Sequence, residues 1–182
     1  MARALVIVDI QDDYFPGGNH PLVGPEEAAA AAARLLARFR ASGEQVVHVQ
    51  HVWDEPDAPF MKPGTPGIEI NAAVAPLAGE TVVQKEHPNA FRETPLESIL
   101  RDAGADELVV CGMMTSMCVD ATVRAAADLG FDVSVAHDAC AAPDLRFGER
   151  LVPAADVHAA FLAALASGYA RVAAADELAE PA

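Results

Sequence analysis

Short apolar runs alternate with longer segments of helical character along the chain. Residues 4–8 are continuously apolar, which is typical of a central strand buried on both faces. Later runs have the same strand character, at residues 45–49, 81–84, 107–111, 132–136 and 170–174. The alternation of strands with helices predicts an α/β domain of three layers, a doubly wound fold in which helices flank a six-stranded parallel sheet.

The segments between these strands carry signals for the beginning and the end of helices. Pro25 and two glutamates open an alanine-rich helix, and Gly43 ends it. Gly104 and Gly130 stand where the C-terminal caps of later helices are expected. These later helices are predicted near residues 68–77, 95–103, 118–129 and 153–167.

One domain accounts for the whole pattern. The chain has 182 residues, of which 52% are hydrophobic, and a domain of about 150 residues buries roughly 70% of its unfolded surface. We find neither an internal repeat nor an inter-domain linker, so we predict a single domain over residues 1–182. The proline-rich stretch 55–67 is expected to form a long loop inside it, and such loops are commonly lids or partner contacts.

Charge and composition exclude several classes of partner. A net charge of −15 with only 12 lysines and arginines argues against a nucleic-acid partner, because phosphate binding needs a basic surface. No apolar run approaches the roughly 20 residues of a membrane span, and the first residues lack the pattern of a signal peptide. We therefore expect a cytoplasmic protein that does not bind membranes, with its three cysteines as free thiols.

Three chemically capable residues follow three of the expected strands. Asp9 and Lys85 stand at the ends of the strands near residues 4–8 and 81–84, and Cys118 lies where the helix after residue 111 begins. Since ligands of open parallel sheets bind outside the carboxyl ends of the strands, these side chains are expected to converge on one crevice. Each residue alone has a structural explanation, as a turn aspartate, a surface lysine or a buried small thiol.

The segments around these residues resemble a known family. They are residues 7–15 (Ile-Val-Asp-Ile-Gln-Asp-Asp-Tyr-Phe), 84–91 (Gln-Lys-Glu-His-Pro-Asn-Ala-Phe) and 109–119 (Val-Val-Cys-Gly-Met-Met-Thr-Ser-Met-Cys-Val). In this order they resemble the isochorismatase-like cysteine hydrolase superfamily, whose amidase members include nicotinamidases, N-carbamoylsarcosine amidases and ureidoacrylate amidases. The resemblance extends from about residue 4 to residue 174. It implies the isochorismatase-like, Rossmann-like fold and a homo-oligomer, either a dimer or a tetramer.

Hydrolysis of an amide requires a nucleophile, a base and a site for the oxyanion. Cys118 would be the nucleophile and Asp9 the base, while Lys85 would hold the carboxylate and lower the pKa of the cysteine. By resemblance to the family, the backbone N–H groups of Met114 and Cys118 would bind the oxyanion. The resemblance also implies a cis peptide bond between Met113 and Met114.

A metal site and other cofactors are not expected. Nicotinamidases of the family hold a divalent ion with an aspartate and histidines after the second strand, but here the corresponding pattern falls on His51 and Trp53. A different site made by His48, His51 and Asp54 is conceivable. Residues three apart on a strand point to opposite sides of the sheet, which disfavours that site.

The candidate substrate contacts flank the ends of the catalytic strands or lie in the long loop. They are Gln11, Phe15, Trp53, Phe60, His87 and Phe91. Phe15 and Phe91 could equally be core residues, and Trp53 or Phe60 could belong to a subunit interface, where aromatic residues are enriched. His87 precedes a proline and could be a simple loop residue.

The sequence therefore predicts a metal-independent cysteine hydrolase that cleaves a C–N bond of a small amide, ureido or lactam compound. Two alternatives stay open. One is an isochorismatase-type hydrolase of a vinyl ether, which needs no thiol, so Cys118 counts against it. The other is a catalytically silent protein of the same fold that binds a small molecule, because a fold alone does not establish an activity.

Overall fold

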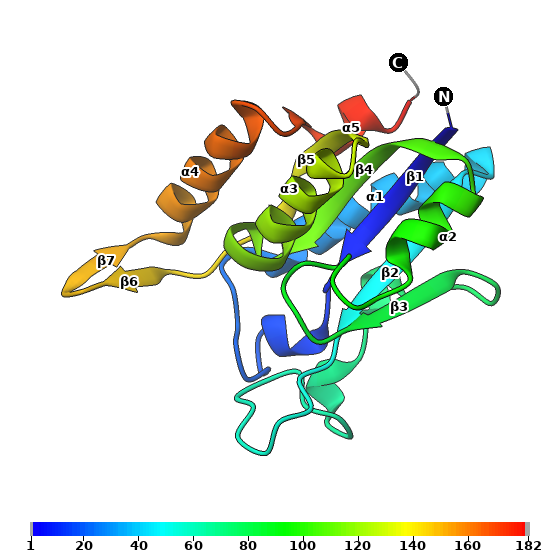
Figure 1. The fold of residues 1–182 in the computed structure, drawn as a ribbon. Coiled ribbons are helices and arrows are strands. Elements are labelled where there is room, and N and C mark those ends of the chain that lie inside the picture. Colours follow the sequence, from blue (N-terminus) through cyan, green and yellow to red (C-terminus); the bar gives the residue numbers. More distant parts are fainter. Residues whose placement is uncertain (1, 181–182) are drawn as a thin grey trace.

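The computed structural model describes residues 2–180, and its centre is one parallel sheet (Figure 1). The order of the strands across the sheet is β3-β2-β1-β4-β5-β8, and every pair of neighbours is parallel. The six-stranded parallel sheet predicted from the sequence is confirmed. Its strands are β1 (Ala2–Val8), β2 (Gln45–His51), β3 (Thr81–Lys85), β4 (Ala105–Met113), β5 (Asp132–Ala141) and β8 (Arg171–Ala173).

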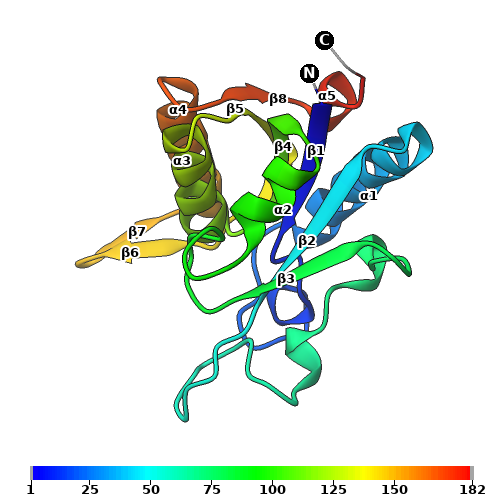
Figure 2. The same cartoon turned by 45° about the vertical axis from the view of Figure 1, so that its right-hand side comes forward.

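Helices cover both faces of this sheet (Figures 1 and 2). Leu5 and Ile7 of β1 pack into one core cluster with the apolar stripe of α1, whereas Val6 and Val8 pack into a second cluster on the opposite face. This alternation follows from the period of two along a strand. The helices are α1 (Pro25–Ser42), α2 (Leu96–Asp102), α3 (Asp120–Asp128), α4 (Ala154–Ala166) and α5 (Ala175–Leu178).

Most of the predicted helices are present, with one clear exception. Residues 68–77 do not form a helix; they contain parts of two short 3-10 turns, Pro66–Ile68 and Ala72–Val74. Between the turns, the backbone N–H of Asn71 donates to Ile10, next to the end of β1, and its side chain accepts from Ala73. These tertiary contacts draw the segment toward the sheet, and Pro76 would interrupt a longer helix. Residues 68–77 therefore form an ordered loop, and the helix predicted there is absent.

Two further elements lie outside the predicted pattern. A hairpin of β6 (Leu145–Phe147) and β7 (Arg150–Val152) extends away from the body of the molecule between β5 and α4 (Figure 1). The short helix α5 follows β8 and packs on α1. Among residues 2–180, the structure contains no helix with the length and apolar character that crossing a bilayer requires.

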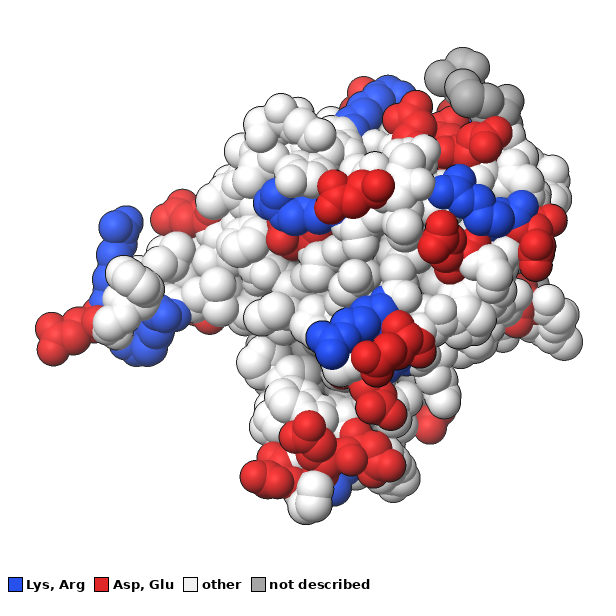
Figure 3. Space-filling model, viewed as in Figure 1, with Lys and Arg blue, Asp and Glu red and all other residues white. Residues whose placement is uncertain are grey.

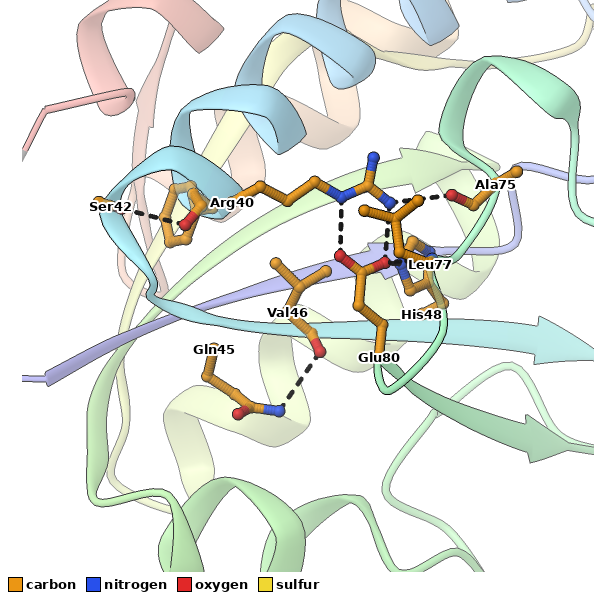
Figure 4. A network of polar contacts seen from close by, with 9 residues as sticks. Arg40, Ser42, Gln45, Val46, His48, Ala75, Leu77 and Glu80 are labelled. Atoms are coloured by element: carbon orange, nitrogen blue, oxygen red, sulfur yellow. Dashed lines mark hydrogen bonds and ion pairs between the residues drawn. The ribbon is translucent and has the colours of Figure 1, made fainter.

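A polar network joins α1, β2 and the turn before β3 (Figure 4). Both nitrogens of the Arg40 fork donate to the carboxylate of Glu80 at 2.7 Å, and the same carboxylate lies 2.9 Å from His48 Nε2. The hydrogen bonds from Arg40 are the main reason that the pKa of Glu80 is lowered to about 2. Burial lowers the pKa of His48. The network therefore holds His48 in a structural role.

Candidate active site

The candidate site lies where the strand order changes direction. The chain proceeds from β1 to β2 and β3 on one side and to β4, β5 and β8 on the other, so β1 and β4 flank the switch point. Helices and loops diverge there and leave a crevice at the carboxyl ends of the strands. Asp9 follows β1, and the turn with Cys118 follows β4. The topology therefore brings both side chains to the position where this fold usually binds ligands.

Asp9 has an unusual backbone and a fully buried side chain. Its N–H still pairs with Val49 of β2 at 3.0 Å, but its φ of 50° then turns the chain away from the sheet. Positive φ is uncommon for residues other than glycine and often marks a functional position. Among the described residues, the carboxylate oxygen Oδ1 has no hydrogen-bond partner. This oxygen is free to accept a proton from a reacting group.

Lys85 forms an ion pair with this carboxylate from the end of β3. Its Nζ lies 2.6 Å from Asp9 Oδ2 and 2.9 Å from Nδ1 of His51, and Lys85 and Asp9 are almost completely buried. Burial opposes the charge on the amine. The carboxylate and the sulfur of Cys118 outweigh burial, so the pKa of Lys85 is raised. The amine therefore stays an ammonium and holds Asp9 in place.

Cys118 sits on a helical turn between β4 and α3. Residues Thr115–Val119 form a single π-helical turn, and α3 begins at Asp120, so Cys118 lies just before the helix predicted to start there. The hydroxyl of Thr115 lies 2.9 Å from Nδ1 of His158 in α4, which ties the turn to the neighbouring helix. One oxygen of Asp9, one nitrogen of His51 and the sulfur of Cys118 lie within 4.8 Å of one another. The structure thus brings together all three residues predicted from the strand ends.

The approach of β4 to β1 depends on Gly112. Its φ is 133°, and a Cβ atom at this position would lie 1.9 Å from the carbonyl oxygen of Val8. Only glycine combines such a φ with so close a contact. The peptide bond that follows, between Met113 and Met114, is cis, as the family resemblance implies. Met114 lines the cavity beside Cys118.

The groups around Cys118 shift the pKa of its thiol in opposite directions. Burial raises the pKa of the thiol, and the negative charge of Asp9 raises it further, while Lys85 acts in the opposite direction. Lys85 thus lowers the pKa of the thiol, as predicted, but burial and Asp9 outweigh it, and the net pKa is raised. Burial is the cause that the sequence could not reveal. The resting state is therefore a thiol next to a carboxylate.

A cavity of about 520 Å³ opens above the thiol. Four rings line one of its sides: Tyr14, His20, Trp53 and Phe60. Phe60 stacks on His20 with their centroids 4.6 Å apart, and it meets Trp53 edge to face at 5.4 Å. Other lining residues follow β3, lie on the turn with Cys118, or precede and begin the hairpin: Glu86, Pro88, Met117, Pro143, Asp144 and Leu145. The cavity is large enough for a small organic molecule.

Asp13 fixes the loop that carries the aromatic residues. Its buried carboxylate accepts the backbone N–H of Met61 at 2.6 Å and both the backbone and the side-chain N–H of Asn19. The backbone N–H of Trp53 donates to the carbonyl of Met61 at 2.9 Å, which joins the two ends of the loop. A side chain at Gly67 would collide with the same carboxylate. Trp53 and Phe60 are therefore held in place within an ordered loop.

Two of the predicted substrate contacts line the cavity, and four lie elsewhere. Trp53 and Phe60 are on its wall. Gln11 is completely buried and uses its amide to join His51 and Ile68 across the strand ends, so it positions the backbone. Phe15 packs against the α1 core and borders a separate hollow. The other two predictions are corrected in the same way: His87 pairs with Glu93 at 3.2 Å, and Phe91 stacks on Phe131.

The residues considered for a metal do not form a suitable site. His48 is bound to Glu80, and Asp54 is exposed in the loop, so neither meets His51. The donors that do converge are Asp9, His51 and Cys118. The ammonium of Lys85 already contacts Asp9 and His51, and Trp53 stands where the family's metal pattern would require histidine. A second cation among these donors would be repelled by the ammonium.

Several residues at the site escaped the sequence analysis. Tyr14 and His20 lie in the segment after β1, and residues 143–145 follow β5. His51 was considered only as a metal ligand, but it contacts Lys85, and burial lowers its pKa to about 4. These residues carry no spacing signal, because they meet only after the loops fold. The aromatic content of residues 14–20 was the one available hint for the first pair.

Comparisons with known proteins point to one family. The family model described as "Isochorismatase domain" matches residues 3–177. An uncharacterized isochorismatase family protein of Bacillus subtilis is 49% identical over 172 residues, which are 94% of this chain and 96% of that protein. A crystal structure described as that of a "putative isochorismatase hydrolase from Oleispira antarctica" has 51% sequence identity and a TM-score of 0.94, covering 98% of this chain and 96% of that one.

Relatives with a stated activity are more distant. A streptothricin hydrolase of Streptomyces noursei is 41% identical over 143 residues, 79% of this chain, and the match spans only 56% of the length of that enzyme. A maleamate amidohydrolase of Pseudomonas putida is 35% identical over 150 residues, 74% of this chain and 70% of that protein.

Proposed function

The chain belongs to the isochorismatase family, and from this premise we propose that it is a cysteine hydrolase that cleaves a C–N bond of a small amide, ureido or lactam compound. The observation that carries the proposal is the position of a buried thiol beside the Asp9–Lys85 ion pair, on the floor of a cavity. The names of the amidohydrolases among its relatives support the reaction class.

The first step is the attack on the carbonyl carbon. Because the resting thiol has a raised pKa, its proton moves to Asp9 as the sulfur forms its bond to carbon. The oxyanion that results is bound by the backbone N–H groups of Met114 and Cys118. Lys85 keeps its proton throughout and offsets the charge that moves between sulfur and carboxylate.

The second half of the reaction releases both products. Asp9 passes its proton to the nitrogen, the C–N bond breaks, and ammonia or an amine leaves a thioester on Cys118. A water molecule then attacks the thioester while Asp9 accepts its proton. Collapse of this second intermediate returns the proton to the sulfur and releases a carboxylic acid or a carbamic acid. No external oxidant or reductant is needed.

Release of ammonia from a panel of primary amides, ureido acids and lactams tests this function, with ring-opened product measured for the lactams. We expect turnover of at least one compound, loss of that turnover in Cys118→Ala, and retention in Cys140→Ala, which removes another buried thiol. Turnover that survives in Cys118→Ala contradicts the mechanism. Saturable binding without any product supports the silent binding protein instead.

We also propose that the chain assembles with a second copy through the β6–β7 hairpin. Phe147 is 85% exposed, and Leu145, which lies two residues earlier on β6 and shares its face of the hairpin, is 38% exposed. Exposed apolar side chains that share a face commonly mark interfaces. Sedimentation of the wild type should show a dimer or a tetramer, and Phe147→Ser should weaken it. Leu77→Ser, at an exposed leucine elsewhere, is the control. A wild type that sediments as a monomer would overturn the assembly.

A further inference from the structure

The charge of the cavity wall is one-sided. Among the described residues that line the cavity there is neither lysine nor arginine, whereas Glu86 and Asp144 contribute two carboxylates, of which that of Asp144 also accepts the backbone N–H of Ala154 at 2.8 Å. The two histidines do not compensate, because burial lowers the pKa of His20 and lowers that of His51 to about 4. Both are neutral at pH 7. Near this wall, the positive charge of Lys85 is already paired with Asp9.

A large part of the cavity wall is aromatic. Trp53 and Phe60 meet at an interplanar angle of 85°, and Tyr14 lies 5.9 Å from Phe60, so the rings form a corner rather than a flat stack. The faces of aromatic rings carry partial negative charge and attract cations, with tryptophan the strongest of the side chains. A cation in such a corner is attracted by the rings and by the carboxylates together. An anion held against the ring faces would be repelled by them and by the carboxylates.

The loop that supplies this corner is itself acidic. Asp54, Glu55 and Asp57 are exposed on the segment between Trp53 and Phe60. In Figure 3 acidic side chains gather on the lobe at the bottom of the view, where Figure 1 shows this loop. Lys62, whose ammonium donates to the carbonyl of Pro56 at 2.7 Å, offsets one of these three charges. An excess of charge of one sign raises the local concentration of oppositely charged ligands. The same loop thus offers both the aromatic contact and a field that favours cations.

We propose that the substrate of this site carries a cationic group, such as an ammonium, which binds against Trp53 and Phe60 while the scissile carbonyl lies at Cys118. The inference rests on the proposed amide hydrolysis and adds to it the class of substrate. A cavity that binds amides with a free carboxylate would need a basic side chain on its wall, and this cavity differs from such a site.

A matched set of three primary amides tests the proposal. Each has the same spacer of three methylenes: 4-(trimethylammonio)butanamide is the cation, 5,5-dimethylhexanamide its neutral isostere, and glutaramate the anion. We expect kcat/KM for the cation to exceed that for the isostere about two- to thirtyfold, from the usual strength of cation–π contacts. The anion should be the poorest substrate. Equal or higher kcat/KM for the isostere or the anion overturns the cation preference but leaves the hydrolase function intact.

In variants we compare the ratio of kcat/KM for the cation to kcat/KM for the isostere. This ratio does not depend on the fraction of folded enzyme. Trp53→Leu keeps an apolar side chain but removes the π face, and Glu86→Gln removes one wall charge, so both should bring the ratio closer to one. Asp106→Asn makes the same change in net charge at an exposed position where β4 begins, and should leave the ratio unchanged. A ratio that is unaffected by Trp53→Leu contradicts the assigned contact.

Binding measured by calorimetry in Cys118→Ala separates this inference from the proposed reaction. If the cation binds more tightly than the isostere but the wild type hydrolyses none of the three, the inference stands and the hydrolase function fails for this set. If the cation binds no more tightly than the isostere, the inference is wrong whatever the turnover.

Discussion

Replacement of Lys85 by methionine should destabilise the protein strongly, although both residues have flexible stems of similar length. At 2.6 Å from Asp9, with an effective dielectric constant of about 20, the attraction between the two charges is about 6 kcal/mol. Part of this only offsets the cost of burying the charges. Removal of one partner of a buried pair typically costs about 3–5 kcal/mol, because the other charge is left without compensation. We expect a loss of that size in Lys85→Met.

A double-mutant cycle isolates this effect from the loss of packing. Asp9→Asn alone should also be costly, because it leaves a buried ammonium. The double variant Asp9→Asn with Lys85→Met removes both charges and keeps both volumes, so its loss of unfolding free energy should be well below the sum of the single losses. Urea denaturation followed by circular dichroism at pH 7 measures all four proteins, and the midpoint and slope show whether each still unfolds in one step.

Two results would show that the ion pair does not stabilise the fold in this way. One is a loss below about 1 kcal/mol in Lys85→Met, which is the range of an exposed ion pair. The other is additivity of the two single losses, which would mean that the charges do not interact in the folded state. In either case the ion pair could not be what positions the base.

Three other perturbations have clear expected outcomes. Gly112→Ala should lower the free energy of unfolding by about 3 kcal/mol or more, measured by heat or urea, because its Cβ would lie 1.9 Å from a backbone oxygen. Gly168→Ala is the control, since a Cβ there meets no atom within 4 Å; equal losses in the two variants would count against the clash. The pKa of Glu80 is lowered to about 2 from a reference of 4.5, so its ionised carboxylate stabilises the fold above pH 4.5, and this stabilisation is lost as the pH falls toward 2. With solvent screening it amounts to about 1–2 kcal/mol, and the free energy of unfolding of Glu80→Gln, measured over the same pH range, should lack this change. Thr115→Val should lower kcat about ten- to hundredfold with little change in melting temperature, because the turn carrying Cys118 loses its link to His158; an unchanged kcat would show that the link is dispensable.

Local patterns were sufficient to predict the sheet. A strand that is buried on both faces has a continuous run of apolar residues, and such runs allowed β1 and its neighbours to be predicted. The same patterns located the strand ends, so the convergence of Asp9, Lys85 and Cys118 could be predicted from the sequence alone. The helix predicted over residues 68–77 was wrong because helix propensity there is weaker than the contact between Asn71 and Ile10.

The cavity and its electrostatics could not be predicted in the same way. Tyr14, Trp53 and residues 143–145 come from three loops, and only tertiary contacts such as those of Asp13 bring them to one wall. The pKa of Cys118 depends on how deeply the thiol is buried. No periodic pattern or residue spacing in the sequence indicates the cavity or the burial of the thiol, because both arise from contacts between distant segments.

The proposed mechanism requires that Cys118 forms a covalent acyl intermediate during amide hydrolysis. The most direct test is intact-protein and peptide mass spectrometry on samples quenched with acid during turnover of an amide found in the substrate panel. We expect an added mass equal to the acyl group on the peptide that contains Cys118, and no such mass in Cys118→Ala. An adduct on Cys111 or Cys140, or turnover by Cys118→Ala at the wild-type rate, would contradict it.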